Sequence, residues 1–247
     1  TYSAREYLKY EACKKTGTEI ADTDLDALQI TDYKEGATIS KWSKDNGGKA
    51  PDIAWDIVQF HPSYGYEDFV RGIEVGTIKT EHGSNVSYET VNKILGKIAE
   101  VASRKEYENT KFFLVIDEIN RANLATVFGE LIYGLEYRGR SVATPYTVKD
   151  SNKVELPDNL YIIGTMNTAD KSIGGIDYAI RRRFLFFSLL PERKTILEFR
   201  KGKCDSPDEE KKQMEINETA VLLFDRVSEL FNSENLNSEY YKDDVQI

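Results

Sequence analysis

Apolar residues along this chain form short continuous runs in some places and helix-like spacings in others. Continuous runs of about four to eight apolar residues are typical of strands buried on both faces, whereas apolar residues three or four positions apart predict helices. Strands of this kind are predicted at 56–60, 112–116, 159–167 and 184–189. Helices are predicted over 3–15, 91–102 and 124–135. Strands and helices that alternate at these lengths predict an α/β fold, in which helices cover both sides of a parallel sheet.

The segments between these elements predict a hairpin, an irregular region and a second domain. The β-rich sequence at 72–88 surrounds an "HGSN" turn and predicts a hairpin, while 17–52 is polar and predicts an irregular region. A polar stretch at 201–212 ends the alternation of strands and helices, and helical spacing without strands follows it. We therefore predict an α/β core over 1–200 and the beginning of a small helical domain over 201–247.

The composition is that of an ordinary globular protein, with 40% apolar and 30% charged residues in a chain of 247. No apolar stretch reaches the roughly 18 residues that a membrane-spanning helix needs, so we expect no membrane partner. A net charge of −9 argues against a surface built as a whole to hold nucleic acid. Cys13 and Cys204 stand apart and are expected to be reduced thiols of a cytoplasmic protein.

The sequence "FFLVIDEINRAN" (112–123) ends a buried-type strand at two adjacent carboxylates, Asp117 and Glu118. In a parallel α/β sheet, chemistry gathers beyond the carboxyl ends of the strands. Asp117 is suited there to hold Mg²⁺ or its bound water, and Glu118 to orient and deprotonate an attacking water. This is the Walker B pattern. The alternative is a strand that ends in solvated acids, and the motif alone does not decide between the two.

A second buried-type strand, "YIIGTMNTAD" (161–170), also ends in polar residues. Asn167 is placed to contact a γ-phosphate or the attacking water from a neighbouring strand, because an amide offers both a donor and an acceptor without adding charge. In AAA+ ATPases this is the sensor 1 position. The alternative is a helix cap, since Thr168 and Asp170 are good capping residues, and the two roles are compatible.

The segment "DYAIRRRF" (177–184) predicts a short helix that ends in three consecutive arginines. One or two of these arginines could reach the nucleotide of a neighbouring subunit as an arginine finger, which supplies positive charge to a phosphoryl group in transfer. The alternative is favourable placement of cations at a helix C-terminus. Three arginines ahead of an apolar strand exceed what the helix dipole requires, and this favours the finger.

Three segments together resemble the McrB-type AAA+ family, the GTPase subunits of McrBC-like methylation-dependent restriction systems. They are "VQFHPSYGYEDFVRGI", "VIDEINRANLATVFGELIYGLE" and "LYIIGTMNTADKSIGGIDYAIRRRF". The resemblance implies a three-layer AAA+ P-loop NTPase core followed by a small helical lid domain. It also implies that Asp117 and Glu118 are Walker B residues, that Asn167 and Asp170 belong to a nucleotide-sensing signature, and that Arg182 and Arg183 are the candidate fingers. Lys171 departs from the family, which usually has arginine there.

A phosphate-binding GxxxxGK[ST] loop is not found in these 247 residues, although the family places one directly ahead of the first helix. We therefore expect Thr1 to be the Walker A threonine or its neighbour. By the resemblance, Thr1 would contact the nucleotide and, with Asp117, the metal.

The resulting prediction is a Mg²⁺-dependent nucleoside-triphosphatase of the McrB type. GTP is preferred over ATP through the resemblance alone. The expected partners are further copies of the chain in a ring, with a hexamer as the expected size, a McrC-like nuclease subunit, and DNA through that complex. Two alternatives stay open: an ATP-driven AAA+ remodeller of another substrate, and a scaffold that has kept the fold without hydrolysis. The intact acids argue against the scaffold.

Overall fold

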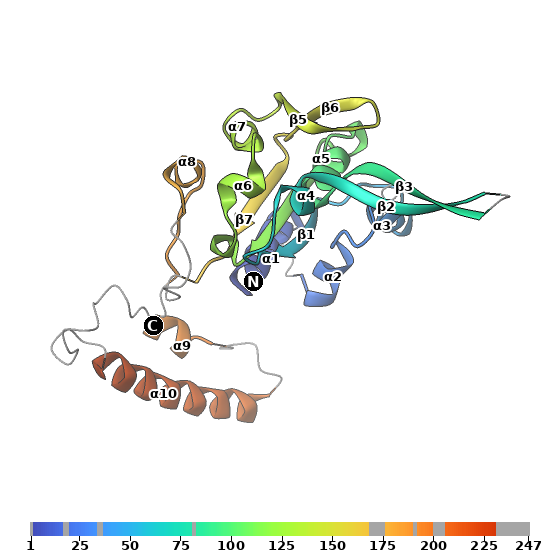
Figure 1. The fold of residues 1–247 in the computed structure, drawn as a ribbon. Helices are drawn as coiled ribbons and strands as arrows, with labels where there is room; N and C mark the ends of the chain where they lie inside the picture. The colour runs from blue at the N-terminus through green and yellow to red at the C-terminus, as the bar shows by residue number, and fades with distance from the viewer. Residues whose placement is uncertain are drawn as a thin grey trace. The chain divides into compact units, whose positions relative to one another are not determined.

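The sheet contains three parallel strands in the order β1-β4-β7. The structure is a computed structural model that describes residues 2–16, 20–33, 37–80, 83–167, 176–189, 192–199 and 206–230. The strands are β1 (Ile53–Gln59), β4 (Lys111–Asp117) and β7 (Leu160–Gly164). The central strand β4 is at most 2% exposed from Phe112 to Ile116, as expected for a strand covered on both faces. The predicted parallel sheet is therefore confirmed (Figure 1).

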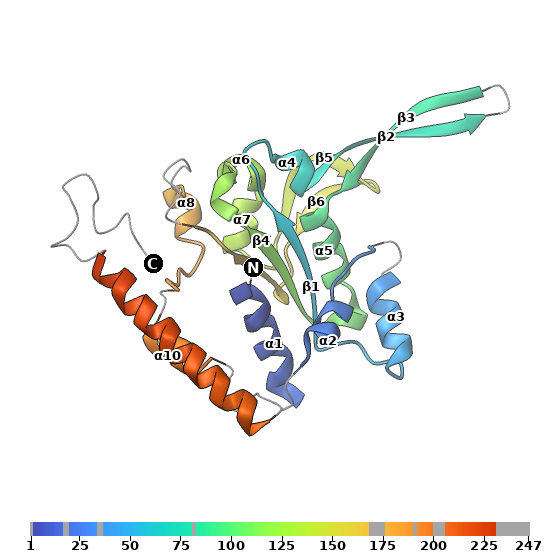
Figure 2. The ribbon, with the colours of Figure 1, turned by 90° about the horizontal axis from the view of Figure 1, so that it is seen from below.

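Helices cover both faces of this sheet, so that the chain forms three layers and the predicted α/β fold is confirmed (Figures 1 and 2). Alternate residues of β4 point to opposite faces. Phe113 and Val115 pack with α1 (Tyr2–Thr16) and α2 (Asp22–Ala27). Phe112, Leu114 and Ile116 belong to a larger core on the other face. That core also takes residues from α5 (Ile94–Ala102), α6 (Leu124–Phe128) and α7 (Leu131–Glu136).

Two antiparallel hairpins accompany the sheet. The predicted hairpin is present as β2 (Arg71–Thr80) and β3 (Gly83–Asn92), which follow α4 (Tyr66–Phe69) and project away from the sheet (Figures 1 and 2). The second hairpin, β5 (Ser141–Val148) and β6 (Ser151–Glu155), was not predicted. Its tight turn at Lys149 and Asp150 has φ values of 49° and 63°, a geometry that Gly or Asn usually supplies. The missing turn signal explains why the sequence pattern did not reveal it.

Three predictions about elements are wrong. The segment 17–52 contains α2 and α3 (Ala37–Asp45), and is therefore not irregular throughout. The helix predicted over 124–135 is divided into α6 and α7 at Gly129, whose φ of 51° lies outside the helical region. Residues 184–189 form no strand, and Leu185 and Phe187 are more than 80% exposed. A strand requires a neighbour to pair its backbone groups, and no described strand pairs with this segment.

The chain divides into two compact units, Thr1–Asn167 with Ser172–Leu185, and Thr168–Lys171 with Phe186–Ile247. In the second unit, α9 (Arg193–Leu197) contacts the long helix α10 (Pro207–Leu230). Asn217 of α10 is buried and its amide donates to the carbonyls of Leu197 and Phe199, at 3.3 and 2.8 Å. The predicted domain boundary at residue 200 stays a prediction. Among the described helices, none is long and apolar enough to span a membrane.

Glu11 on α1 forms an ion pair that ties this helix to β4. Its carboxylate accepts a hydrogen bond from Lys111 Nζ at 2.5 Å, and its side chain is 6% exposed. The hydrogen bond from Lys111 outweighs burial and holds the pKa of Glu11 below its usual range. A carboxyl whose pKa is lowered on folding adds stability at neutral pH, and that stability is lost as the pH falls through the lowered pKa.

We therefore expect Glu11→Gln to lower the free energy of unfolding at pH 7, because the ion pair with Lys111 is lost. The expected loss is only about 1 kcal/mol, because Lys111 is 40% exposed and solvent partly screens the pair. The loss should shrink toward zero as the pH falls through the lowered pKa of Glu11, because the carboxyl then becomes protonated and both proteins are uncharged at this position. Thermal unfolding from pH 3 to pH 8 measures it. The matched control is Glu106→Gln, at an exposed position, and an equal effect in both variants at every pH would contradict the assignment.

Candidate nucleotide-hydrolysis site

The acid pair lies where β4 ends, at the carboxyl edge of the sheet. Asp117 is the last residue of the strand and is in register with Gln59 of β1. Its Oδ1 accepts a hydrogen bond from Thr165 Oγ1 at 2.6 Å, just beyond the end of β7. The backbone fixes this contact, because Thr165 N donates to Ile116 O and Ile119 N donates to Thr165 O, each at 2.9 Å. The polar ends of the two strands therefore meet, as their parallel arrangement predicted.

Glu118 has a backbone conformation that is unusual for its residue type. Its φ of 55° and ψ of 46° lie in the left-handed region, which costs a residue with a Cβ about 1–2 kcal/mol. The turn takes the chain out of β4 and into a short 3₁₀ helix, Ile119–Arg121. Glu118 Oε2 accepts from Arg121 Nε at 3.2 Å, and the glutamate side chain is 23% exposed. Strain of this kind persists where surrounding structure imposes it, and it often accompanies functional positions.

Asn167 lies exposed beyond β7 and is joined to the acid-bearing segment through Asn120. Asn120 Nδ2 donates to the carbonyl of Asn167 at 3.3 Å. Asn120 Oδ1 is buried and has no hydrogen-bond partner among the described residues. The helix described next, α8 (Tyr178–Arg181), is capped by Asp177, whose side chain accepts from Ala179 N at 2.6 Å. The proposed sensor role of Asn167 stays a prediction, as does the capping alternative.

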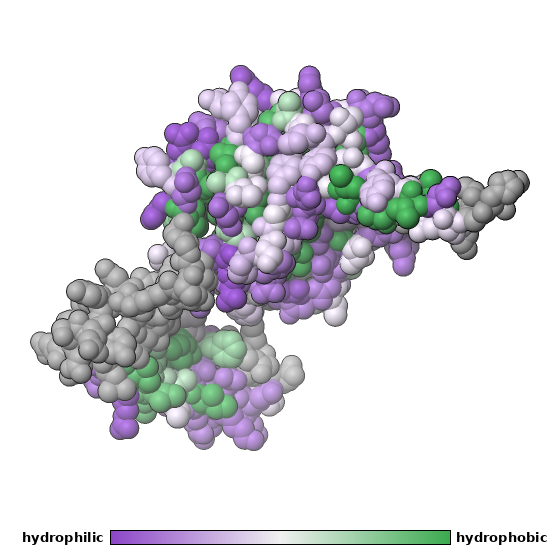
Figure 3. Space-filling view, viewed as in Figure 1, coloured by the Kyte–Doolittle hydropathy of each residue, from purple (hydrophilic) through white to green (hydrophobic). Residues whose placement is uncertain are grey.

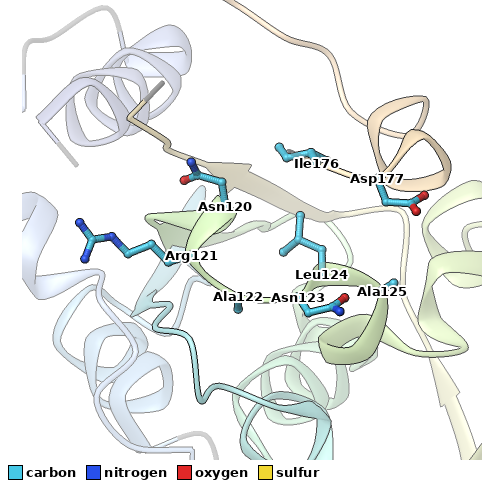
Figure 4. Close-up of a pocket in the computed structure, with 8 residues that line it drawn as sticks. All are labelled: Asn120, Arg121, Ala122, Asn123, Leu124, Ala125, Ile176 and Asp177. Carbon is cyan, nitrogen blue, oxygen red and sulfur yellow. The ribbon is translucent and has the colours of Figure 1, made fainter. Parts of the chain in front are cut away.

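A cavity of about 490 Å³ borders this region (Figure 4). It is lined by Asn120, Arg121, Ala122, Asn123, Leu124, Ala125, Ile176 and Asp177. Figure 4 shows Arg121 extending away from the side where Leu124 and Ile176 lie. Neither Asp117 nor Glu118 lines the cavity, so it flanks the acid pair and does not enclose it.

The two candidate finger arginines differ in their surroundings. Arg183 Nη2 donates to Glu136 Oε2 of α7 at 2.6 Å, its Nη1 donates to the carbonyl of Ala179, and its side chain is 9% exposed. Arg182 approaches the same Glu136 oxygen at 3.7 Å and is 55% exposed. Within one chain, Arg183 therefore fastens α8 to α7, whereas Arg182 is the more accessible of the two. Both finger assignments stay predictions.

Two predicted site residues, Thr1 and Asp170, lie outside the described residues, as does the departure at Lys171. Sequence reasoning assigned no role to Thr165 or Asn120, which the structure joins to Asp117 and Asn167. The sequence does contain a signal for both residues, because each is polar and follows a buried strand. Thr165 comes directly after β7, and Asn120 lies about one turn after β4.

The donor set at the strand end suits Mg²⁺. Among the described residues, no group of three His, Cys, Asp or Glu side chains could hold a metal. Magnesium does not require such a group, since it usually takes one or two carboxylates and completes its shell with water and phosphate oxygens. Asp117, with one oxygen held by Thr165, fits that pattern.

A buried parallel strand that ends at an Asp-Glu pair, beside a strand that is followed by Thr165 and Asn167, is the arrangement of an α/β P-loop NTPase-like fold. Residues 53–184 match the AAA domain of the dynein-related subfamily. This match covers more than half of the chain, which therefore belongs to the AAA domain family.

Two curated relatives are restriction proteins. The chain is 40% identical over 149 residues to the type IV methyl-directed restriction enzyme EcoKMcrB subunit of Escherichia coli K12, covering 59% of this chain and 30% of that protein. It is 37% identical over 92 residues to the type II restriction enzyme BsuMI component YdiS of Bacillus subtilis 168, covering 31% and 26% respectively. The prediction of a McrB-type AAA+ chain is confirmed. The chain spans less than a third of the length of either relative.

Proposed function

We propose that this chain is the nucleoside-triphosphatase core of a McrB-like motor subunit, and that its hydrolysis site lies at the carboxyl ends of β4 and β7. The observation that carries the proposal is the hydrogen bond from Thr165 to Asp117, beside the strained turn at Glu118. The acid pair at the end of β4 therefore lies beside the polar residues that follow β7. The similarity to restriction subunits supports the motor role over other uses of the fold.

Each residue has a distinct part in this proposal. Asp117 would hold Mg²⁺, with Thr1 as the second expected ligand, and the metal would supply positive charge against the triphosphate. Glu118, at the left-handed turn that ends β4, accepts the proton of the attacking water. Asn167 orients that water or the terminal phosphate. Asn120 contributes by holding the Asn167 backbone in place.

We further propose that Arg182 or Arg183 completes the site of a neighbouring subunit in a ring. A guanidinium aimed at a phosphoryl group stabilises the charge that develops during transfer. The exposure of Arg182 favours it as the group that reaches across, with Arg183 and Glu136 holding its helix in position. A McrC-like nuclease and DNA are the further partners that the relatives suggest, and the ring size is proposed as six.

The second candidate function is that of an ATP-driven remodeller, and the choice of base separates it from the first. We expect the full-length protein to bind GTP more tightly than ATP, by analogy with McrB-type subunits. Competition of unlabelled GTP and ATP against a fluorescent GTP analogue measures the preference. ATP binding about tenfold more tightly than GTP would instead support the remodeller.

A further inference from the structure

Arg71, the first residue of β2, is a buried cation, and within the described part of the chain its hydrogen bonds all end on neutral oxygen atoms. It is 4% exposed. Its guanidinium donates to Asn92 Oδ1 at 2.8 Å, Thr144 Oγ1 at 2.9 Å, and the carbonyls of Tyr146, Ser151 and Lys153 at 3.0, 3.1 and 2.9 Å. Burial lowers the pKa of Arg71, but an arginine stays protonated at neutral pH. A full positive charge is therefore held here by amide, hydroxyl and carbonyl oxygens.

An irregularity in the second hairpin provides these oxygens. The β5–β6 pairing runs regularly from Ser141 to Ala143, and then shifts so that Val148 faces Ser151. Residues 144–147 therefore bulge out of the ladder, and their backbone groups, with those opposite, require other partners. One carbonyl of the bulge, that of Tyr146, accepts from Arg71, and so do the carbonyls of Ser151 and Lys153, whose ladder pairs flank the bulge on the opposite strand. A planar guanidinium with five N–H donors matches several converging acceptors, which the compact ammonium group of lysine does not.

A second set of contacts closes the connection between the hairpins. Asn92, the last residue of β3, accepts from Arg71 and donates through Nδ2 to Glu100 Oε2 of α5 at 2.9 Å. Lys149, in the β5–β6 turn, donates to Glu100 Oε1 at 2.7 Å. Burial raises the pKa of Glu100, but the hydrogen bonds from Lys149 and Asn92 hold it below its usual range. Both hairpins are thus fastened to each other and to α5.

The β2–β3 hairpin depends on contacts at its base, where Arg71 and Asn92 lie, to keep its strands paired. A two-stranded ribbon is marginally stable by itself, because it buries little apolar surface. Along β2 and β3, four apolar side chains on one face remain more than half exposed: Ile73, Val75, Val86 and Tyr88. Figure 3 shows apolar side chains along this projecting ribbon. Gly72 fits closely at the base, where an added Cβ would lie 2.4 Å from the Glu67 carbonyl oxygen.

We propose that Arg71 is a clamp that joins the β2–β3 and β5–β6 hairpins into one rigid arm, so that a movement of either hairpin is transmitted to the other. The clamp is independent of the nucleotide chemistry proposed above. Arg71 fills the bulge in β5–β6 with a group carried by β2. Removing the guanidinium leaves the carbonyls of Tyr146, Ser151 and Lys153 without this donor, and leaves the β2–β3 hairpin without its hydrogen bonds to β5–β6.

Hydrogen exchange in the full-length protein tests the clamp. Arg71→Ala should raise the exchange rates of amides in both hairpins together by about 10- to 100-fold, as expected for loss of buried charge-assisted hydrogen bonds. Amides of β4 should keep their protection and so report that the core is folded. Faster exchange in β2–β3 with β5–β6 unchanged would overturn the proposal, because the hairpins would then be independent.

Chemical rescue distinguishes a loss of the guanidinium hydrogen bonds from a general loss of packing around residue 71. Guanidinium ion, at concentrations far below those that denature proteins, should restore protection to both hairpins of Arg71→Ala by donating to the same carbonyls. Potassium ion at equal ionic strength should not. Arg71→Lys is the matched variant that keeps the charge, and it should remain loose because lysine cannot reach the converging acceptors. Equal protection in Arg71→Lys and the natural protein would refute the guanidinium-specific clamp.

A milder pair of variants serves if Arg71→Ala does not fold. Asn92→Ala removes an Arg71 partner on one hairpin and Thr144→Ala removes one on the other. Each should raise exchange in the opposite hairpin as well as its own. Effects confined to the substituted hairpin would overturn the proposal.

Discussion

Glu118→Gln is expected to abolish turnover in the full-length protein while preserving nucleotide binding. The amide keeps the shape of the carboxylate and cannot accept a proton from water, so hydrolysis should fall by about 10²- to 10⁴-fold. The fold should survive, because the strained turn at Glu118 is a property of the backbone and its ion pair with Arg121 is partly exposed. Steady-state phosphate release and equilibrium binding of a GTP analogue measure the two effects separately.

Asp117→Asn is the matched comparison and should fail at a different step. Its side chain would still accept from Thr165, so the strand end should keep its geometry. The lost charge should weaken Mg²⁺-dependent binding itself. Glu106→Gln, at an exposed position, controls for a simple change of charge. If both site variants retained near-natural turnover, the Walker B assignment would be wrong.

Removal of both candidate finger arginines is the second change with a large expected effect. Arg182→Ala with Arg183→Ala should reduce hydrolysis by about 10³- to 10⁵-fold, the range found where such arginines have been removed from phosphoryl-transfer sites. The single variants should differ. Arg182→Ala should lose hydrolysis with unchanged unfolding, whereas Arg183→Ala should also lower stability, because Glu136 loses its buried partner.

Phosphate release and thermal unfolding of the three variants distinguish these roles. Normal hydrolysis in the double variant would show that the arginines only stabilise the C-terminus of α8 and take no part in hydrolysis. Arg193→Ala is a matched control, since Arg193 is a half-exposed arginine of the second unit, paired with Asp225.

The sequence pattern predicted the sheet because burial on both faces leaves an unmistakable apolar run. The strand containing Phe112 to Ile116 is an example, and the acids that follow it were placed at the sheet edge for the same reason. The pattern could not predict the left-handed turn at Glu118, since that conformation is imposed by tertiary structure against the preference of the residue. The contact between Thr165 and Asp117 joins residues 48 positions apart, and local spacing carries no information about it.

The wrong predictions have related causes. An apolar run at 184–189 satisfies the local preference for a strand, but a strand forms only where a partner supplies hydrogen bonds. The helical spacing across 124–135 is real on both sides of Gly129, and the positive φ of that residue interrupts the helix without disturbing the spacing. Arg71 was not singled out, because its acceptors come from an irregular hairpin that the pattern did not reveal.

A mixing experiment tests most directly whether the hydrolysis site at Asp117 and Glu118 is completed by arginines of a neighbouring subunit. Full-length Glu118→Gln and the double variant of Arg182 and Arg183 are each expected to be nearly inactive alone. Mixed, they should recover part of the phosphate release, because some interfaces then combine an intact glutamate with intact arginines from the other subunit. The recovery should increase with total protein concentration. No recovery at any ratio or concentration, with both variants shown to assemble, would contradict the shared site.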